Sequence, residues 1–165
     1  FILFLQEVLL LEFIEKLGFA VTRGSENDVL DRYYQAAKAH QADSVVRITG
    51  DCPLVDANLV DTVVATFKQN EADYVSNIEP PTYPDGLDIE VFSFKVLEGM
   101  WKKCKLKSER EHVTTYIREH SHEFKIKNIV NDVDLSMLRW TVDEKVDFEL
   151  VEKIYAELYK KDKLS

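Results

Sequence analysis

Cysteine is scarce in this chain of 165 residues, which holds only Cys52 and Cys104. Two thiols cannot supply a disulfide framework or a four-cysteine zinc site, so the sequence excludes both. Such sparse cysteine usage fits a reducing compartment, and we expect a cytoplasmic protein.

Basic residues are in the minority, with 21 Lys and Arg against 30 Asp and Glu and a formal net charge of -9. A nucleic-acid polymer needs a basic surface for its phosphates, so this balance argues against such a partner. A single nucleotide is not excluded, because a divalent metal ion on acidic residues can hold a triphosphate.

A long uninterrupted hydrophobic run is also missing. Residues 1–14 are strongly apolar, but Gln6, Glu7 and Glu12 interrupt them, and the stretch is short for a membrane span. No basic leader precedes it, which argues against a signal peptide. We therefore expect no membrane partner and interpret the stretch as a core element of a chain that has lost its true beginning.

Hydrophobic periodicity predicts strands that alternate with helices through the first half of one domain, residues 1–165. The expected strands are 19–22, 44–49, 74–76, 88–94, 124–130 and 138–142, and the expected helices are 8–17, 27–41, 58–69, 95–103, 108–120 and 144–158. Ser25 with Asp28, and Ser108 with Glu111, have the spacing of helix-opening capping boxes. The alternation predicts an α/β fold with a mostly parallel sheet covered on both faces and an antiparallel excursion in the middle.

The turn after the strand at residues 44–49 organises the rest of the chain. Gly50 ends the strand, and Asp51 follows at its carboxyl end, where open α/β sheets place ligand-binding groups. Pro53 cannot continue a strand, and Asp56 is a good N-cap for the next helix. The alternative is that Asp51 is a turn aspartate that bonds its own backbone.

The sequence of this turn, GDCPLV at residues 50–55, resembles the G-D-x-P-L-[IV] motif of sugar nucleotidyltransferases. Within that family it is similar to the cytidylyltransferases that activate acidic sugars, and most similar to the spore-coat polysaccharide biosynthesis branch. Four more stretches carry the resemblance in the family's order: RGSENDVLDRY at 23–33, YPDGLDIEVF at 83–92, SEREHV at 108–113 and LRWTVDE at 138–144. The first motif alone is weak, but the five together are a specific signal.

This resemblance implies a three-layer α/β/α domain, Rossmann-like, of the nucleotide-diphospho-sugar transferase type. It also implies cytidylyl transfer from a nucleoside triphosphate, expected to be CTP, to a sugar acid or sugar phosphate for cell-surface polysaccharide. Pyrophosphate would leave as the sugar oxygen attacks the α-phosphorus. Mg²⁺ or Mn²⁺ would be the cofactor, because a metal ion neutralises the phosphate oxygens.

Two catalytic metal ligands follow from the resemblance, Asp51 and Asp143. Asp143 is the first aspartate of the segment at residues 142–147, which aligns with a late I-D-x-x-x-D pattern of the family; the alternative is a cap for the last helix, a role compatible with metal binding. If both residues end parallel strands at one sheet edge, their carboxylates should lie roughly 4 to 8 Å apart, since magnesium takes oxygens at about 2.1 Å.

Seven further residues are candidates for substrate binding: Arg47, Tyr83, Asp85, Asp88, Glu90, Arg110 and His112. An inward-facing Arg47 needs a carboxylate partner, with Asp31 as a candidate, and we favour that pair over contact with a phosphate or a sugar carboxylate. Glu90 faces away from the apolar side of its strand, which favours a cleft position. For His112 an exposed helix face is favoured over a substrate contact.

The family's glycine-rich phosphate loop has no counterpart here, and the family would place it before Phe1. We therefore expect weak nucleotide binding, because the backbone N–H cradle for phosphates is missing. An apolar face should lie open beside residues 1–11, and we expect a homo-oligomer.

Two other function classes are alternatives. Asp132 and Asp134 spell the D-x-D of metal-dependent glycosyltransferases, but they lie in a late polar turn rather than after a central strand. The other alternative is a non-catalytic interaction domain.

Overall fold

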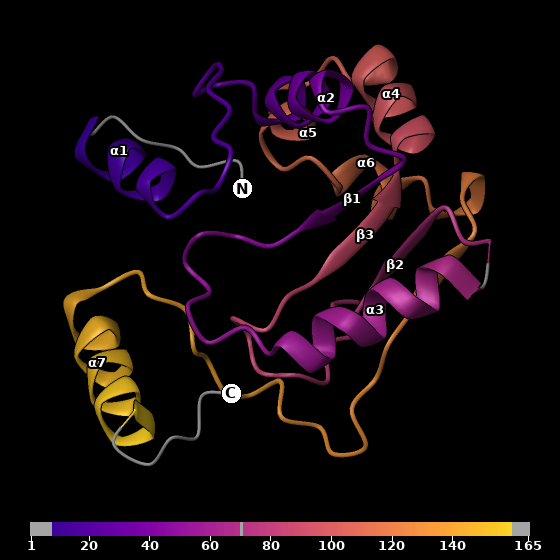
Figure 1. Ribbon diagram of the computed structural model, residues 1–165. Coiled ribbons are helices and arrows are strands. Elements are labelled where there is room, and N and C mark those ends of the chain that lie inside the picture. Colours follow the sequence, from indigo (N-terminus) through magenta and orange to yellow (C-terminus); the bar gives the residue numbers. More distant parts are fainter. Residues whose placement is uncertain (1–7, 70, 160–165) are drawn as a thin grey trace. The chain divides into compact units, whose positions relative to one another are not determined.

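The computed structural model describes residues 8–69 and 71–159, which form an α/β fold (Figure 1). Its elements are α1 (Val8–Lys16), α2 (Val29–Ala39), β1 (Ser44–Arg47), α3 (Ala57–Gln69), β2 (Tyr74–Ser76), β3 (Glu90–Ser93), α4 (Phe94–Lys103), α5 (Lys107–Glu111), α6 (Thr115–Glu119), η1 (Ser121–Glu123), β4 (Ile126–Asn128) and α7 (Lys145–Tyr159). None of the described helices is both long enough and apolar enough to cross a bilayer.

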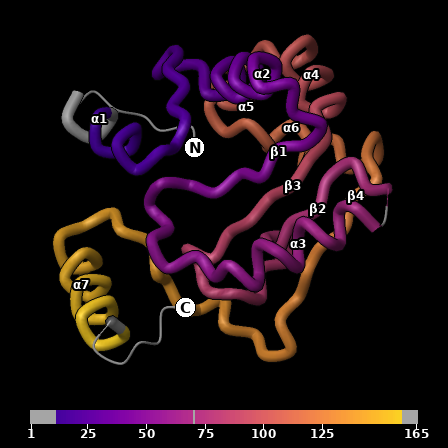
Figure 2. Tube along the Cα trace, viewed as in Figure 1, coloured from indigo at the N-terminus to yellow at the C-terminus, as the bar shows by residue number. Residues whose placement is uncertain are grey.

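The four strands form one mixed sheet in the order β1-β3-β2-β4 (Figures 1 and 2). The arrows of β1 and β3 point in opposite directions in Figure 1, so the expectation of a mostly parallel sheet is wrong for the described strands. A parallel return needs a crossover that is usually a helix. Residues 77–89, which join β2 to β3, contain no helix, and the chain enters β3 with its direction reversed.

The chain divides into two compact units, and each is described by itself. The first, called the helical unit, consists of residues 8–45, 71–74 and 92–126. The second, called the motif unit, consists of residues 46–69, 75–91 and 127–159. The apolar face expected beside residues 1–11 involves residues 1–7, which lie outside the described residues, so the homo-oligomer stays a prediction.

The helical unit has its core between α2, α4, α5 and α6. Its buried side chains are Leu30, Tyr34, Ala37, Tyr74, Phe92, Val96, Leu97, Met100, Cys104, Val113, Tyr116 and Ile117. The ring of Tyr34 stacks on Trp101 with a centroid distance of 4.2 Å, which joins α2 to α4. Such a pair adds to the apolar area that both rings bury.

The cap of α2 is Asp28 rather than the predicted Ser25. Its carboxylate accepts a hydrogen bond of 2.9 Å from the backbone N–H of Asp31. The same carboxylate also accepts from Arg110 Nε at 2.6 Å. A negative charge at a helix N-terminus is favourable, and this pair ties the start of α2 to α5.

The helix expected over residues 108–120 is interrupted. It is replaced by α5 and α6, and between them Val113 has a φ of 34° and is fully buried. Three consecutive β-branched residues, Val113, Thr114 and Thr115, weaken the helix here. The start of α5 uses Glu109, whose carboxylate accepts from the N–H groups of Lys105 and Leu106, and not the predicted Ser108 box.

In the motif unit, α3 begins where the sequence predicts. Asp56 precedes the helix and accepts from the N–H of Asn58 at 2.8 Å, which confirms it as the N-cap. The expected strand at 138–142 does not form, and only an isolated parallel bridge joins Asp85 to Arg139. Residues 19–22 of the helical unit are not a strand either, because a short apolar run carries little periodicity.

The apolar face of α7 is narrower than predicted. Val151 is buried, and the Tyr155 hydroxyl donates to the Pro53 carbonyl at 2.7 Å. The apolar pattern of the helix expected over residues 144–158 predicts an inward face that includes Val146 and Leu150, but these two residues are 68% and 47% exposed. At 100° per residue, Val146 lies about 160° and Leu150 about 120° from the middle of the face that Val151 and Tyr155 define, so both positions point away from that face.

We predict opposite effects from two glycine substitutions. Gly86 has a φ of +103°, and an added Cβ would lie 2.8 Å from the Trp140 carbonyl carbon. Gly86→Ala should lower the free energy of unfolding by about 2 kcal/mol or more. Gly99, inside α4, has open space around an added Cβ, so Gly99→Ala should raise it by about 0.5–1 kcal/mol. Urea unfolding midpoints measure both, and equal midpoints would contradict the packing around Gly86.

Candidate active site

Three loop segments of the motif unit come together through backbone hydrogen bonds. The N–H of Asp85 donates to the Leu138 carbonyl at 3.0 Å, and the N–H of Trp140 donates to the Asp85 carbonyl at 2.7 Å. Further along, the N–H of Val142 donates to the Asp51 carbonyl at 2.9 Å. One extended segment therefore holds both the motif turn and the loop of Asp85.

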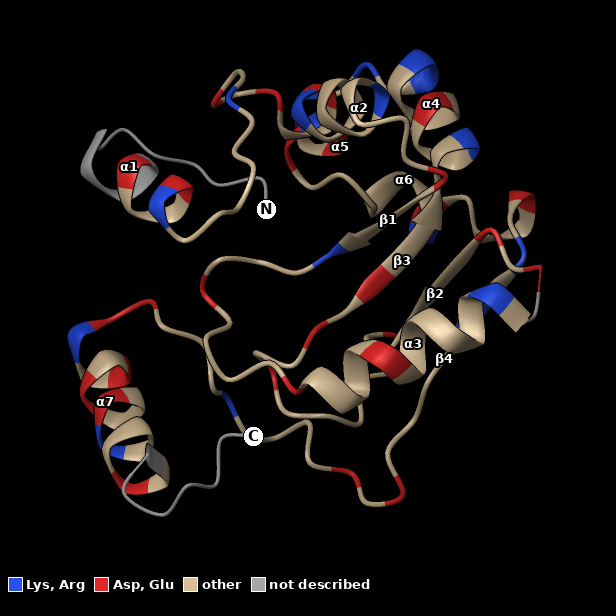
Figure 3. Cartoon of the chain, in the orientation of Figure 1, with Lys and Arg blue, Asp and Glu red and all other residues tan. Residues whose placement is uncertain are grey.

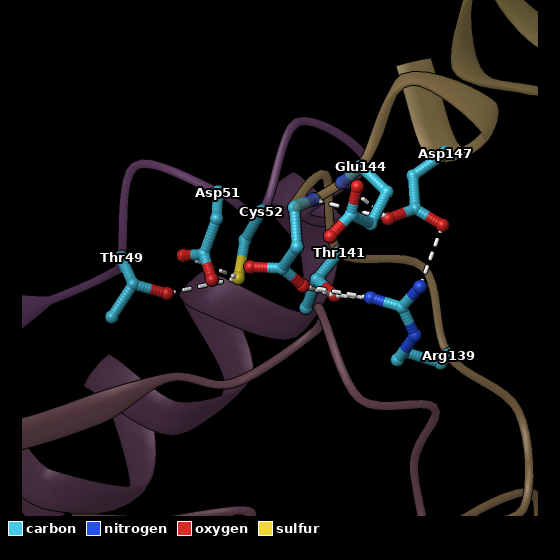
Figure 4. A network of polar contacts seen from close by, with 8 residues as sticks. Thr49, Asp51, Cys52, Arg139, Thr141, Glu144 and Asp147 are labelled. Carbon is cyan, nitrogen blue, oxygen red and sulfur yellow. Dashed lines mark hydrogen bonds and ion pairs between the residues drawn. The ribbon is translucent and has the colours of Figure 1, made fainter. Parts of the chain in front are cut away.

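The motif turn presents Asp51 beside a buried thiol (Figure 4). Cys52 Sγ lies 3.7 Å from Asp51 Oδ1 and 3.0 Å from Thr49 Oγ1. Burial, with a smaller contribution from the charge of Asp51, raises the pKa of Cys52 to about 11. The thiolate is the nucleophilic form of cysteine, so Cys52 is not suited to nucleophilic catalysis at neutral pH.

The Asp143 carboxylate is held by side chains of its own segment. Its Oδ2 accepts from Arg139 Nη1 at 2.7 Å and from Thr141 Oγ1 at 2.8 Å. Arg139 Nη2 donates to Asp147 Oδ1 at 2.6 Å, and Asp147 Oδ2 accepts from the N–H groups of Asp143 and Glu144. The bond to Arg139 is the main cause that lowers the pKa of Asp147.

This network separates two roles that the sequence left open for Asp143. The last helix begins at Lys145, and Asp147 in its first turn supplies the carboxylate that accepts from the preceding N–H groups. Asp143 is thus not the capping side chain, and its side chain is 57% exposed.

A cluster of carboxylates surrounds one arginine at the adjoining ends of β1 and β3. Arg47 forms an ion pair with Glu90, which is almost fully buried; in Figure 3 the end of β1 is blue and the start of β3 is red. Burial first, and then the charges of Asp85 and Glu90, raise the pKa of Asp88 to about 6. The charge of Asp51 contributes in the same direction, whereas Arg47 opposes the shift.

Asp31, the partner suggested for Arg47, has other contacts. Its Oδ1 accepts from Trp101 Nε1 at 2.7 Å and from Gln35 Nε2 at 3.1 Å. The hydrogen-bonded neighbours β1 and β3 bring Glu90 to Arg47 instead, so an ion pair was correctly favoured but its partner was wrong.

The motif unit contains seven of the nine candidate residues: Arg47, Asp51, Tyr83, Asp85, Asp88, Glu90 and Asp143. Arg110 and His112 belong to the helical unit. Arg110 donates to the Asp28 carboxylate and to the carbonyls of Trp101 and Cys104, and these contacts stabilise the helical unit. His112 is exposed at the end of α5, as the sequence favours. Substrate binding by these two residues stays a prediction.

Sequence reasoning missed the roles of Arg139, Thr141 and Asp147. A signal was present, because positions 139, 141 and 143 alternate and point to the same side of an extended segment. Their contacts with Asp143 follow from that spacing once the segment is extended.

The donor set fits a magnesium ion that is completed by a substrate. Within residues 8–69 and 71–159, no group of three or more His, Cys, Asp or Glu side chains is arranged to hold a metal ion. Mg²⁺ in phosphate-transfer sites is bound by one or two carboxylates together with phosphate oxygens and waters. Asp51 and Asp143 supply two such carboxylates on segments joined by the Val142 hydrogen bond, and their binding of a metal ion stays a prediction.

Solved structures place the fold in a class. The chain aligns with CMP:2-keto-3-deoxy-manno-octonic acid synthetase complexed with CTP, with a TM-score of 0.61, 13% identity, and coverage of 94% of this chain and 78% of the other. At that identity the likeness shows the fold alone, and it agrees with the α/β fold described above.

Residues 8–164 match the family described as Cytidylyltransferase, and the chain belongs to that family. It is 35% identical to the structure of a cytidylyltransferase from Leptospira borgpetersenii, with a TM-score of 0.86 over 92% of this chain and 66% of that chain. The resemblance drawn from the five motifs is confirmed.

Two curated relatives extend this result. An uncharacterized protein of Methanocaldococcus jannaschii is 43% identical over 92% of this chain, and the spore coat polysaccharide biosynthesis protein SpsF of Bacillus subtilis is 32% identical over 85%. The aligned region covers 60% and 58% of their lengths, so the chain spans about three fifths of the curated relatives it matches.

We predict that Asp88→Asn stabilises the protein only where Asp88 is ionised. Because the folded state raises the pKa of Asp88 to about 6, it binds this proton more tightly than the unfolded state. The wild type should therefore gain stability from this group as the pH falls through 6 towards 4. In metal-free buffer, Asp88→Asn should have the higher Tm at pH 7.5 and no advantage at pH 4.

Asp61→Asn is the control, since Asp61 is exposed on α3 and the charge change is the same. Its Tm difference from the wild type should not follow the titration of Asp88. A gain for Asp88→Asn at pH 4 as large as at pH 7.5 would contradict the assigned cause.

Proposed function

We propose that this chain carries the metal-binding and sugar-binding part of a cytidylyltransferase site. The reaction is cytidylyl transfer from CTP to a sugar acid or sugar phosphate, with release of pyrophosphate. The observation that supports it best is the hydrogen bond between the Val142 N–H and the Asp51 carbonyl. This bond brings the family-matching Asp51 next to the segment of Asp143, the two residues that the resemblance assigns to the metal.

The residues present suit a reaction without a protein nucleophile. An oxygen of the sugar attacks the α-phosphorus, and the bond from that phosphorus to the pyrophosphate oxygen breaks. Bound Mg²⁺, or Mn²⁺, would neutralise charge on the phosphate oxygens, and Asp51 and Asp143 would hold it. Cys52, with a pKa of about 11, remains a thiol and has no part in the transfer.

The loop of residues 83–88 is the proposed sugar side of the site. Carboxylates accept hydrogen bonds from hydroxyl groups, so Asp85 and Asp88 would bind sugar hydroxyls, with Tyr83 beside them. Glu90 is buried in its pair with Arg47 and would act by orienting that guanidinium. Arg47 is 21% exposed, and it would face a phosphate or a sugar carboxylate.

The name of the Bacillus relative supports a role in polysaccharide biosynthesis. We extend the proposal to a three-layer, Rossmann-like α/β/α domain in a cytoplasmic homo-oligomer. Arg110 and His112 of the helical unit complete the set of substrate-binding candidates.

The glycosyltransferase alternative gains nothing from its D-x-D pattern. Asp134 Oδ1 accepts from the N–H and the hydroxyl of Ser136, which makes it a turn residue. These bonds lower the pKa of Asp134 without a metal ion. The cytidylyl transfer is therefore the function that we propose.

We predict that Asp51→Asn removes metal-dependent CTP binding. Isothermal calorimetry with CTP and Mn²⁺ should show binding to this chain, weaker than micromolar, and a loss of roughly a hundredfold or more for Asp51→Asn. Asp56→Asn is the matched control in the same turn, because Asn caps a helix as well as Asp does. The transfer reaction itself is measured by the release of pyrophosphate when sugar acids are supplied as acceptors.

Equal binding by the Asp51→Asn variant, or CTP binding that EDTA leaves unchanged, would overturn the metal assignment. Release of free nucleoside diphosphate from a nucleotide sugar would instead favour the glycosyltransferase.

A further inference from the structure

We propose that Arg139 is a positioning residue that orients Asp143 for a divalent cation. This inference rests on the proposed metal-dependent cytidylyl transfer and names a residue that the motif comparison left without a role. The bonds from Arg139 and Thr141 both end on Oδ2 of Asp143. The carboxylate is thereby fixed through one oxygen, and the other oxygen, Oδ1, would bind the cation.

The guanidinium itself is held at two points. Its Nη1 donates to Asp143 and its Nη2 donates to Asp147, at 2.7 and 2.6 Å. A planar fork that spans two carboxylates cannot rotate without breaking one of these bonds. Arg139 therefore transmits the position of Asp147 to Asp143.

Asp147 is the anchor of this arrangement. Its Oδ2 accepts from the N–H groups of Asp143 and Glu144 at 3.1 and 2.9 Å, and only 13% of its side chain is exposed. Anchored in the first turn of α7, Asp147 ties the orientation of the Asp143 carboxylate to the start of that helix.

The backbone of Arg139 is fixed independently of its side chain. Arg139 forms the parallel bridge with Asp85, and the N–H of Trp140 donates to the Asp85 carbonyl. Three residues beyond Arg139, Val142 is bonded to Asp51. A substitution of the Arg139 side chain should leave these contacts in place, so it tests orientation rather than folding.

Charge and orientation predict opposite results for the loss of Arg139. Removal of a positive charge beside a cation site would tighten cation binding by a few-fold, because like charges repel. Loss of the bonds that orient a metal ligand weakens binding, typically by 10- to 100-fold. The sign of the change separates the two effects.

The experiment measures the dissociation constant of Mn²⁺ by electron paramagnetic resonance, with and without CTP, on the whole chain. We expect Arg139→Met to weaken Mn²⁺ binding by about tenfold or more, and Arg139→Lys to give a smaller loss, since a lysine reaches one carboxylate at a time. Lys145→Met is the control: it removes the same charge nearby in the sequence, and Lys145 pairs with Glu149 rather than with either aspartate. It should bind Mn²⁺ as well as the wild type or slightly more tightly.

Asp147→Asn gives a second test that does not depend on the stability of the Arg139 variants. It should weaken Mn²⁺ binding in the wild type but add no further loss to Arg139→Met, because the amide oxygen of Asn still accepts from the N–H groups of Asp143 and Glu144 and only the ion pair with Arg139 is lost. Arg139→Met or Asp147→Asn that binds Mn²⁺ as tightly as the wild type would overturn the inference. If Mn²⁺ binding by the wild-type chain does not depend on Asp51, so that Asp51→Asn leaves it unchanged, the proposed function is overturned as well. The failure of the inference and the failure of the proposed function are therefore distinguishable.

Discussion

The hydrogen bond between the Val142 N–H and the Asp51 carbonyl is the contact on which the candidate site depends. It belongs to a segment that is also hydrogen-bonded to both the N–H and the carbonyl of Asp85. Backbone donors and acceptors in loops need partners, and here two loops obtain them from one extended stretch. Residues 138–142 are thus the connection that links the turn of Asp51 to the loop of Asp85 by backbone hydrogen bonds.

Bringing these carboxylates together has an electrostatic cost, and the protein offsets it locally. Arg47 neutralises buried Glu90, and Arg139 bridges the exposed Asp143 and the largely buried Asp147. For Asp88, burial and the neighbouring carboxylates raise the pKa to about 6, so this side chain retains its proton more readily. A cation that arrives with a nucleotide would add the positive charge that this arrangement favours.

The candidate site was only partly predictable from the sequence. Asp51 and Asp143 were identified from motifs, and Asp56 from its place before a periodic helix. The partner of Arg47 was assigned wrongly, because a strand residue can be paired with a carboxylate only when its neighbouring strand is known. The same holds for Arg139, whose two partners lie close in sequence but meet it only in an extended segment.

The sequence by itself determined the α/β class, the family, the helices that follow strong 3.6-residue periods, and the turn that presents Asp51. The helices and the turn depend on residues within about ten positions of one another, where propensity and capping act directly. Only the tertiary structure decided the mixed sheet, the break at Val113 and the exposure of Val146 on α7. Each of these depends on which distant segment offers hydrogen bonds and apolar area, and that choice is made by packing rather than by local sequence.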